Sequence, residues 1–201
     1  MLRRMAAGPA YRRLENDERR RRLLDLGARL FTEHAYDEIS MSQIAREAGI
    51  SKALLYHYFP SKRDYFVATL AGGAEALRTL VEPDPDLPAA QALAAALDTY
   101  LTWIEENSEA YAKLFRSAGA VPEVRELVEG VRTATADRIL EGIGATDNPK
   151  ARTAVRGWLW FMDGACLDWI ANRDLERAEL HGLLLGTLAG TLMAAGVQLV
   201  A

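Results

Sequence analysis

The chain has 201 residues, 50% hydrophobic and 26% charged, with a formal net charge of -4 and one cysteine. This composition is typical of a soluble globular protein and excludes a disordered chain, a collagen and a disulfide-bonded scaffold. Ala and Leu supply 62 residues against 27 for Val, Ile and Thr, so we expect an all-α fold. Cys166 has no intrachain disulfide partner, and no signal peptide is recognisable at the N-terminus, which indicates a cytoplasmic protein.

The charge is divided unevenly along the chain. Residues 1–66 contain 13 Lys and Arg against 9 Asp and Glu, a net charge of +4, whereas residues 67–201 contain 11 against 19, a net charge of -8. Such an asymmetry suggests that the basic part binds a polyanion, although random surface charge is the alternative.

The N-terminal residues 1–15 are predicted to form a flexible basic arm, because Gly8 and Pro9 interrupt them and no helical period is sustained. Residues 3–22 hold eight arginines. They either follow the phosphates or the minor groove of DNA, or form a solubilising tail. A first helix is expected from about residue 16 or 17 to about His34.

Three further helices follow at short intervals. Ser40 and Gln43 form a capping box for a helix that Gly49 closes. Ser51 caps the next helix, residues 51–58, which Pro60 ends because it disfavours helical geometry at the preceding residue. A fourth helix is expected at 61–80.

A proline-rich break at residues 82–88 separates these helices from a longer Ala- and Leu-rich part. The helices expected beyond it are 89–106, 108–118, 122–142, 149–171 and 175–199.

Two short helices joined by a glycine turn predict a helix-turn-helix with residues 51–58 as its second helix. Leu55 and Phe59 should face inward, while Lys52, Ala53, Tyr56 and His57 face outward. Such an exposed row suits DNA phosphates and base edges, but periodicity alone equally allows a solvated helix end.

The segment ISMSQIAREAGISKALLYHYFPSKRDYF, residues 39–66, resembles the DNA-binding signature of TetR-family transcriptional regulators. With the helix at 17–34 and the fourth helix, the resemblance covers roughly residues 16–75, about a third of the chain. It implies an all-α homodimer with an N-terminal three-helix helix-turn-helix DNA-binding domain, here 16–66, and a larger helical domain, 67–201, that binds a small-molecule inducer and dimerises. The partners implied are a double-stranded DNA operator, a hydrophobic inducer and a second copy of the chain, with no cofactor and no metal.

The same resemblance implies which residues contact DNA. They are Ser42, Ser51, Lys52, Leu54, Tyr56, His57, Tyr58 and Lys62. Ser42 and Lys62 match positions at which the family binds phosphate. Leu54 stands where many members have a small polar residue, and it either presses on a thymine methyl group or shields the core.

The C-terminal domain carries no comparable signature. Aromatic and sulfur-containing side chains at helical spacing suit either a small-molecule pocket or a helical core. The candidate ligand-binding residues are Tyr100, Trp103, Tyr111, Phe115, Trp158, Met162, Cys166 and Trp169. Asp163 and Asp168 interrupt this apolar pattern, and if buried they need a partner such as an inducer cation, Arg152, Arg156 or another subunit; otherwise they lie on the surface.

Residues 182–201 are uncharged, with Gly182, Gly186 and Gly190 four residues apart. This spacing suits a transmembrane helix pair. It also suits a dimer interface, which the resemblance favours.

No motif indicates an enzyme, and Cys166 is expected in the core. The sequence therefore predicts a ligand-responsive repressor released from a palindromic operator. The alternative is a helical interaction protein, or a membrane-associated one anchored by its last helix.

Overall fold

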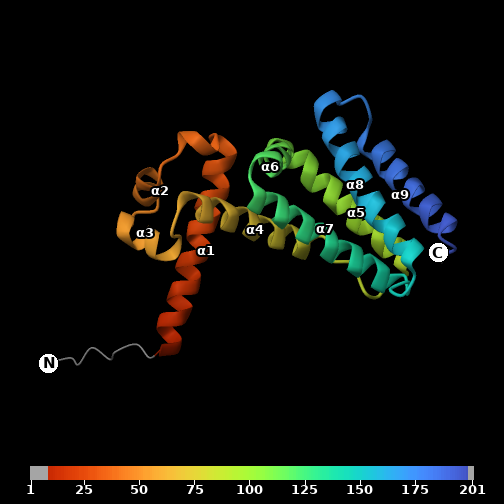
Figure 1. Ribbon diagram of the computed structural model, residues 1–201, viewed down its shortest axis with the longest axis horizontal. Helices are drawn as coiled ribbons and strands as arrows, with labels where there is room; N and C mark the ends of the chain where they lie inside the picture. Colours follow the sequence, from red (N-terminus) through yellow and green to blue (C-terminus); the bar gives the residue numbers. More distant parts are fainter. Residues whose placement is uncertain (1–8, 199–201) are drawn as a thin grey trace. The chain divides into compact units, whose positions relative to one another are not determined.

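The computed structural model describes the backbone of residues 9–198 and the side chains of residues 16–198. In that range every regular element is helical, as the composition predicts (Figure 1). The helices are α1 (Pro9–Glu33), a 3-10 turn η1 (Tyr36–Glu38), α2 (Met41–Glu47), α3 (Lys52–Tyr58), α4 (Lys62–Leu80), α5 (Ala89–Glu106), α6 (Ser108–Ala120), α7 (Pro122–Gly142), α8 (Pro149–Asn172) and α9 (Arg177–Ala194). The chain divides into two compact units, Met1–Gly73 and Ala74–Ala201, called here the head and the body.

The first helix is longer than predicted. It begins at Pro9 instead of near Asn16, so the second half of the expected arm is helical. Proline is well suited to the first turn of a helix, where its missing N–H would have had no partner, and the residues that follow are mostly good helix formers. The rest of the predicted arm, residues 1–8, lies outside the described residues.

The head is built around side chains that α1, α2, α3 and α4 bury together. The ring of Phe31 on α1 meets that of Phe66 on α4 edge to face at 4.8 Å, and the Phe59 ring meets Tyr65 at 4.9 Å. Tyr65 is fully buried, and its hydroxyl donates to the carbonyl of Leu23 at 2.5 Å. This bond fastens α4 to α1.

The short helices of the head begin and end where the turn chemistry predicts. Ser40 Oγ accepts from the amide of Gln43 at 3.2 Å, and Ser51 Oγ accepts from that of Leu54 at 3.1 Å. Gly49 has φ +65°, the left-handed conformation that closes α2. Phe59, before Pro60, is extended. The two helices therefore meet at a fixed, tight turn.

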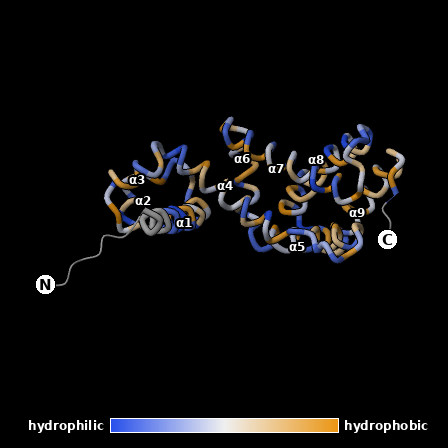
Figure 2. Tube along the Cα trace, turned by 90° about the horizontal axis from the view of Figure 1, so that it is seen from below, coloured by the Kyte–Doolittle hydropathy of each residue, from blue (hydrophilic) through white to orange (hydrophobic). Residues whose placement is uncertain are grey.

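The body packs α5 to α9 around one hydrophobic core. Along each helix hydrophobic residues alternate with hydrophilic ones (Figure 2). The central helix α8 packs against both α7 and α9, and the indole N–H of Trp158 donates to the carbonyl of Leu184 at 2.8 Å across the second contact. α9 turns a leucine stripe inward, made of Leu180, Leu184, Leu188 and Leu192.

The last helix is shorter than predicted. It ends at Ala194 instead of residue 199, and Gly196 follows with φ +79°. Within residues 9–198 no helix has the length and hydropathy needed to cross a membrane.

Candidate DNA interface and effector cavity

Helix α3 has the orientation that the sequence predicts. Leu55 and Phe59 are buried, whereas Lys52, Tyr56 and His57 are exposed, with 41% of Tyr56 accessible to solvent. The Lys52 ammonium lies 5.8 Å from the centre of the Tyr56 ring. Buried anchors on one side leave a cation, a phenol and an imidazole on the other, and all three can donate hydrogen bonds to phosphate or base edges.

Tyr58 lies differently from its neighbours in α3. It is half-buried, and its hydroxyl donates to Asn16 Oδ1 at 3.0 Å and accepts from Arg19 at 3.5 Å. Its oxygen thus joins the end of α3 to α1. Arg20, which follows Arg19 in α1, places its guanidinium 5.4 Å from the centre of the Phe59 ring. Arg19 and Arg20 of α1 are in this way brought next to the C-terminal end of α3, which the sequence pattern alone does not reveal.

The ammonium of Lys62 is occupied within the head. Its Nζ donates to the carbonyls of Tyr36 and Ile39, each at 2.9 Å, and lies 4.2 Å from the centre of the Tyr36 ring. Two of its three N–H donors are therefore used to hold η1 and the following turn against the start of α4. This geometry gives Lys62 a bracing position within the head, and the phosphate contact that the resemblance implies for it stays a prediction.

The remaining candidate DNA contacts lie at helix starts. Ser42 is exposed in the first turn of α2. Ser51 is exposed and caps α3 through its hydroxyl, and Leu54 is half-buried.

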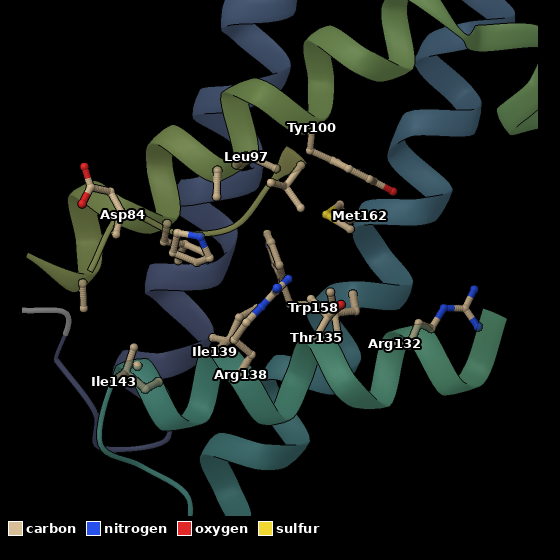
Figure 3. Close-up of a pocket in the computed structure, with 18 of the residues that line it drawn as sticks. Asp84, Leu97, Tyr100, Arg132, Thr135, Arg138, Ile139, Ile143, Trp158 and Met162 are labelled. Carbon is tan, nitrogen blue, oxygen red and sulfur yellow. The ribbon is translucent and has the colours of Figure 1, made fainter. Parts of the chain in front are cut away.

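The body contains a cavity of about 340 Å³ between α5, α7, α8 and the loop of residues 81–87 (Figure 3). A volume of this size suits a small organic ligand. Three of the eight predicted ligand residues line it: Tyr100, Trp158 and Met162. The other five, Trp103, Tyr111, Phe115, Cys166 and Trp169, belong to the surrounding core. The same helical spacing serves both, so periodicity could not separate them.

A buried polar network borders the cavity. Tyr100 donates to the hydroxyl of Tyr111 at 3.3 Å, Tyr111 donates to Asp163 Oδ1 at 3.0 Å, and Arg132 Nε donates to Asp163 Oδ2 at 2.7 Å. Burial raises the pKa of Asp163 and raises those of both tyrosines well above their usual values. Burial also raises the pKa of the Cys166 thiol to about 12, so this cysteine is held protonated.

The partner of Asp163 is not one of those expected from the sequence. Arg132 on α7 holds it, whereas Arg152 and Arg156 are exposed, and Asp168 is an exposed residue that accepts from Asn172 at 2.9 Å. Arg132 lies 31 residues before Asp163, so only the packing of α7 on α8 brings the two charges together.

Sequence reasoning also missed the contribution of α7 to the cavity. Arg132, Thr135, Arg138 and Ile139 line it from this helix. In Figure 3 the Arg138 side chain points from α7 toward α5, alongside Trp158. Polar residues three or four apart on a helix more often mark a solvated face, so the pattern gave no signal of a cavity wall.

α8 and α9 each carry exposed apolar side chains, and the candidate interface glycines are exposed on α9. Gly182, Gly186 and Gly190 are exposed on α9, opposite its buried leucines, and a Cβ added at any of them would meet nothing within 4 Å. Met193 on α9 and Trp160 on α8 are 69% and 60% exposed. Phe161 on α8 and Leu183 on α9 are also exposed, and these exposed residues of the two helices are together called here the α8–α9 face.

Among the described residues no group of His, Cys, Asp and Glu could hold a metal ion.

The profile described as "Bacterial regulatory proteins, tetR family" matches residues 23–69, and that described as "Tetracyclin repressor-like, C-terminal domain" matches residues 89–190. The transcriptional activator FasR of Mycolicibacterium smegmatis is 30% identical over 151 residues, which are 71% of this chain and 66% of FasR. The transcriptional regulator BetI of Agrobacterium fabrum is 44% identical over 52 residues, 26% of this chain and 25% of BetI. The chain thus spans just under two thirds of FasR and a quarter of BetI.

Among solved structures, a tetR-family transcriptional regulator from Streptomyces coelicolor is 30% identical with a TM-score of 0.77. The match covers 90% of this chain and 82% of that one.

Proposed function

Because the chain belongs to the TetR family of bacterial transcriptional regulators, with a helix-turn-helix DNA-binding domain, we propose that it is a homodimeric regulator whose operator binding responds to a small molecule held in the body. The observation that carries the proposal is the head itself, in which buried Leu55 and Phe59 turn Lys52, Tyr56 and His57 outward from α3. Its relatives are named as transcriptional regulators, and we propose no enzymatic activity.

On DNA, α3 lies in the major groove and its exposed row contacts base edges and phosphates. Ser42 and Ser51 contact phosphates from the first turn of α2 and the cap of α3. Leu54 presses on a thymine methyl group from the rim of the row. Tyr58 contacts the DNA backbone together with Arg19, which donates a hydrogen bond to the Tyr58 hydroxyl.

The two copies associate through the α8–α9 face. Glycines let helices approach closely, and the exposed rings and methionine beside them supply apolar area to bury. The domain boundaries follow from this division: residues 16–66 bind DNA, and 67–201 bind the ligand and the second copy.

The cavity between α5, α7 and α8 binds the ligand. A ligand that prefers the body conformation with the wrong head spacing would shift the population away from operator-bound dimers. Release of a repressor is the output we favour. Activation is the second candidate, because FasR is named an activator. Deleting the gene separates them: expression from a promoter carrying the operator rises for a repressor and falls for an activator.

The test of DNA binding is a gel-shift titration of the full chain with the DNA upstream of its own gene. Tyr56→Ala combined with His57→Ala should abolish the shift while sedimentation still reports a dimer. His34→Ala, at an exposed histidine of the same head outside α3, should leave the affinity within twofold. An unchanged shift with the double variant refutes the assignment of α3.

A further inference from the structure

Arg138 brings a cation to a largely apolar cavity. Its side chain is 27% exposed, and Figure 3 shows it beside Trp158, between α7 and α5. Apolar side chains such as Leu97 and Met162 line the deeper part of the cavity, toward Tyr100. A guanidinium held there is poorly solvated and needs an anion beside it.

The carboxylate beside Arg138 is that of Glu82, and it binds Arg138 only weakly. Glu82 is the one hydrogen-bond partner of Arg138 among the described residues, at 3.3 Å from Nη1 to Oε2. The Glu82 side chain is 54% exposed, and the same Oε2 atom accepts from Arg78 at 3.1 Å. A guanidinium has five donors, so most of those on Arg138 are unused within the described part of the chain.

The other arginine of the cavity wall is already neutralised. Arg132 donates to Asp163 at 2.7 Å and to Glu129 at 2.5 Å, and its guanidinium is stacked 3.9 Å from the Trp160 ring. A ligand anion placed there would be repelled by two carboxylates. The acidic residue Asp84 lies at the opposite end of the cavity from Tyr100, in an exposed loop (Figure 3).

We infer that the cavity binds an amphipathic organic anion, whose acidic group pairs with Arg138 in place of Glu82 and whose apolar body lies against Leu97, Trp158 and Met162. This inference rests on the proposed function and gives its ligand a chemical class. The planar fork of a guanidinium matches a carboxylate in two parallel hydrogen bonds, which a single long bond to Glu82 does not use. The cavity volume equals that of about eleven water molecules at ~30 Å³ each, enough for a body of roughly ten carbons.

Exchange of Glu82 for the ligand also changes a contact of α4. Glu82 joins Arg78, in the last turn of α4, to Arg138 on α7. When the ligand takes Arg138, Glu82 keeps only Arg78, and the tie between the end of α4 and α7 is lost. The ligand thus competes with an internal carboxylate, and occupation of the cavity loosens α4, which continues into the head.

Three small-molecule probes test the inference: decanoate, decan-1-ol and decylamine. They share a ten-carbon alkyl group and differ in the polar group at its end. Isothermal titration calorimetry with the full chain at pH 7.5 should give at least tenfold tighter binding for decanoate than for either other probe. Arg138→Gln should weaken decanoate at least tenfold and change decan-1-ol less than threefold. Glu82→Gln should tighten decanoate at least twofold, because the competing carboxylate is gone.

Arg125→Gln is the matched control, since Arg125 is exposed on the same helix and does not line the cavity. It should leave all three affinities unchanged. Equal binding of decan-1-ol or decylamine, decanoate binding that survives Arg138→Gln within twofold, or binding of no probe overturns the inference. Operator binding by the same samples is measured in parallel. If the probes fail these tests while the operator is still bound, the proposed DNA binding stands. If the probes bind as expected but the wild type does not bind the operator, only the proposed DNA binding is refuted.

Discussion

Gly27 on α1 lies where this helix and α4 approach closely, and Gly27→Ala tests the packing of the head. A Cβ at this position would lie 2.4 Å from Thr69 Oγ1 and 2.8 Å from Tyr65 Oη. Neither atom is free to move away, because the Tyr65 hydroxyl is bonded to the Leu23 carbonyl and the Thr69 hydroxyl is bonded to the Tyr65 carbonyl at 2.8 Å. The added methyl group must therefore shift α1 from α4 or break a buried hydrogen bond.

The magnitude follows from opposing terms. Overpacking of a core costs about 1–3 kcal/mol and loss of a buried hydrogen bond about 1 kcal/mol more. The better helix propensity of alanine offsets about 1 kcal/mol. We therefore expect Gly27→Ala to lower the free energy of unfolding of the head by about 1–3 kcal/mol. Gly73→Ala is the control: the added Cβ meets nothing within 4 Å in α4, so it should stabilise by about 0.5–1 kcal/mol.

Urea unfolding can follow the two units separately. All four tryptophans, Trp103, Trp158, Trp160 and Trp169, belong to the body, so their fluorescence reports the body, while circular dichroism reports both units. Gly27→Ala should lower the midpoint of the head transition by circular dichroism and leave the fluorescence midpoint unchanged. Adding Thr69→Ala, which removes the nearest atom, should restore part of the loss. A Gly27→Ala protein as stable as the Gly73→Ala protein would refute the close-approach reasoning.

Three further predictions concern Lys62, the buried carboxylate of Asp163 and the α8–α9 face. Lys62→Met should destabilise the head by about 1–3 kcal/mol, since two carbonyls lose their donor. The slope of log operator affinity against log salt concentration should equal that of the wild type, because loss of one phosphate contact in each subunit of the dimer would instead reduce the slope by about 1.8. Burial raises the pKa of Asp163, so the stability linked to its proton is present at low pH and lost as the pH rises through the folded-state pKa. Thermal unfolding should therefore show that the wild type becomes more stable relative to Asp163→Asn as the pH falls from 7 to 4.5. A difference in stability that does not change with pH would contradict this linkage. Gly186→Glu should convert dimers to monomers in sedimentation, whereas Gly130→Glu, at an exposed glycine of α7, should not; dimers in both would exclude the α8–α9 face.

The head was predictable because its signals are local. Ser40, Ser51 and Pro60 act on residues within three positions of themselves, so helix limits and the burial of Leu55 follow from neighbours in sequence. Lys62 shows the limit of this reasoning. Its ammonium binds carbonyls 23 and 26 residues earlier, and only the folded chain shows that these donors are occupied.

The cavity was less predictable because its parts are distant in sequence. An apolar stripe on α8 identified Trp158 and Met162, but the same stripe holds Cys166 in the core. Arg138 reads as a surface residue until α5 and α8 pack beside it. Charge pairing across helices, such as Arg132 with Asp163, depends on which helices become neighbours, and local periodicity carries no information about that.

Operator binding through α3 is tested most directly by DNase I footprinting of the full chain on the DNA upstream of its own gene. We predict two protected half-sites with centres about 10–10.5 base pairs apart, or ~34–36 Å, as two α3 helices in successive major grooves require. The Tyr56→Ala, His57→Ala double variant should leave the DNA unprotected while remaining dimeric. A footprint that the double variant reproduces, or no protection by the wild-type dimer, would contradict operator binding through α3.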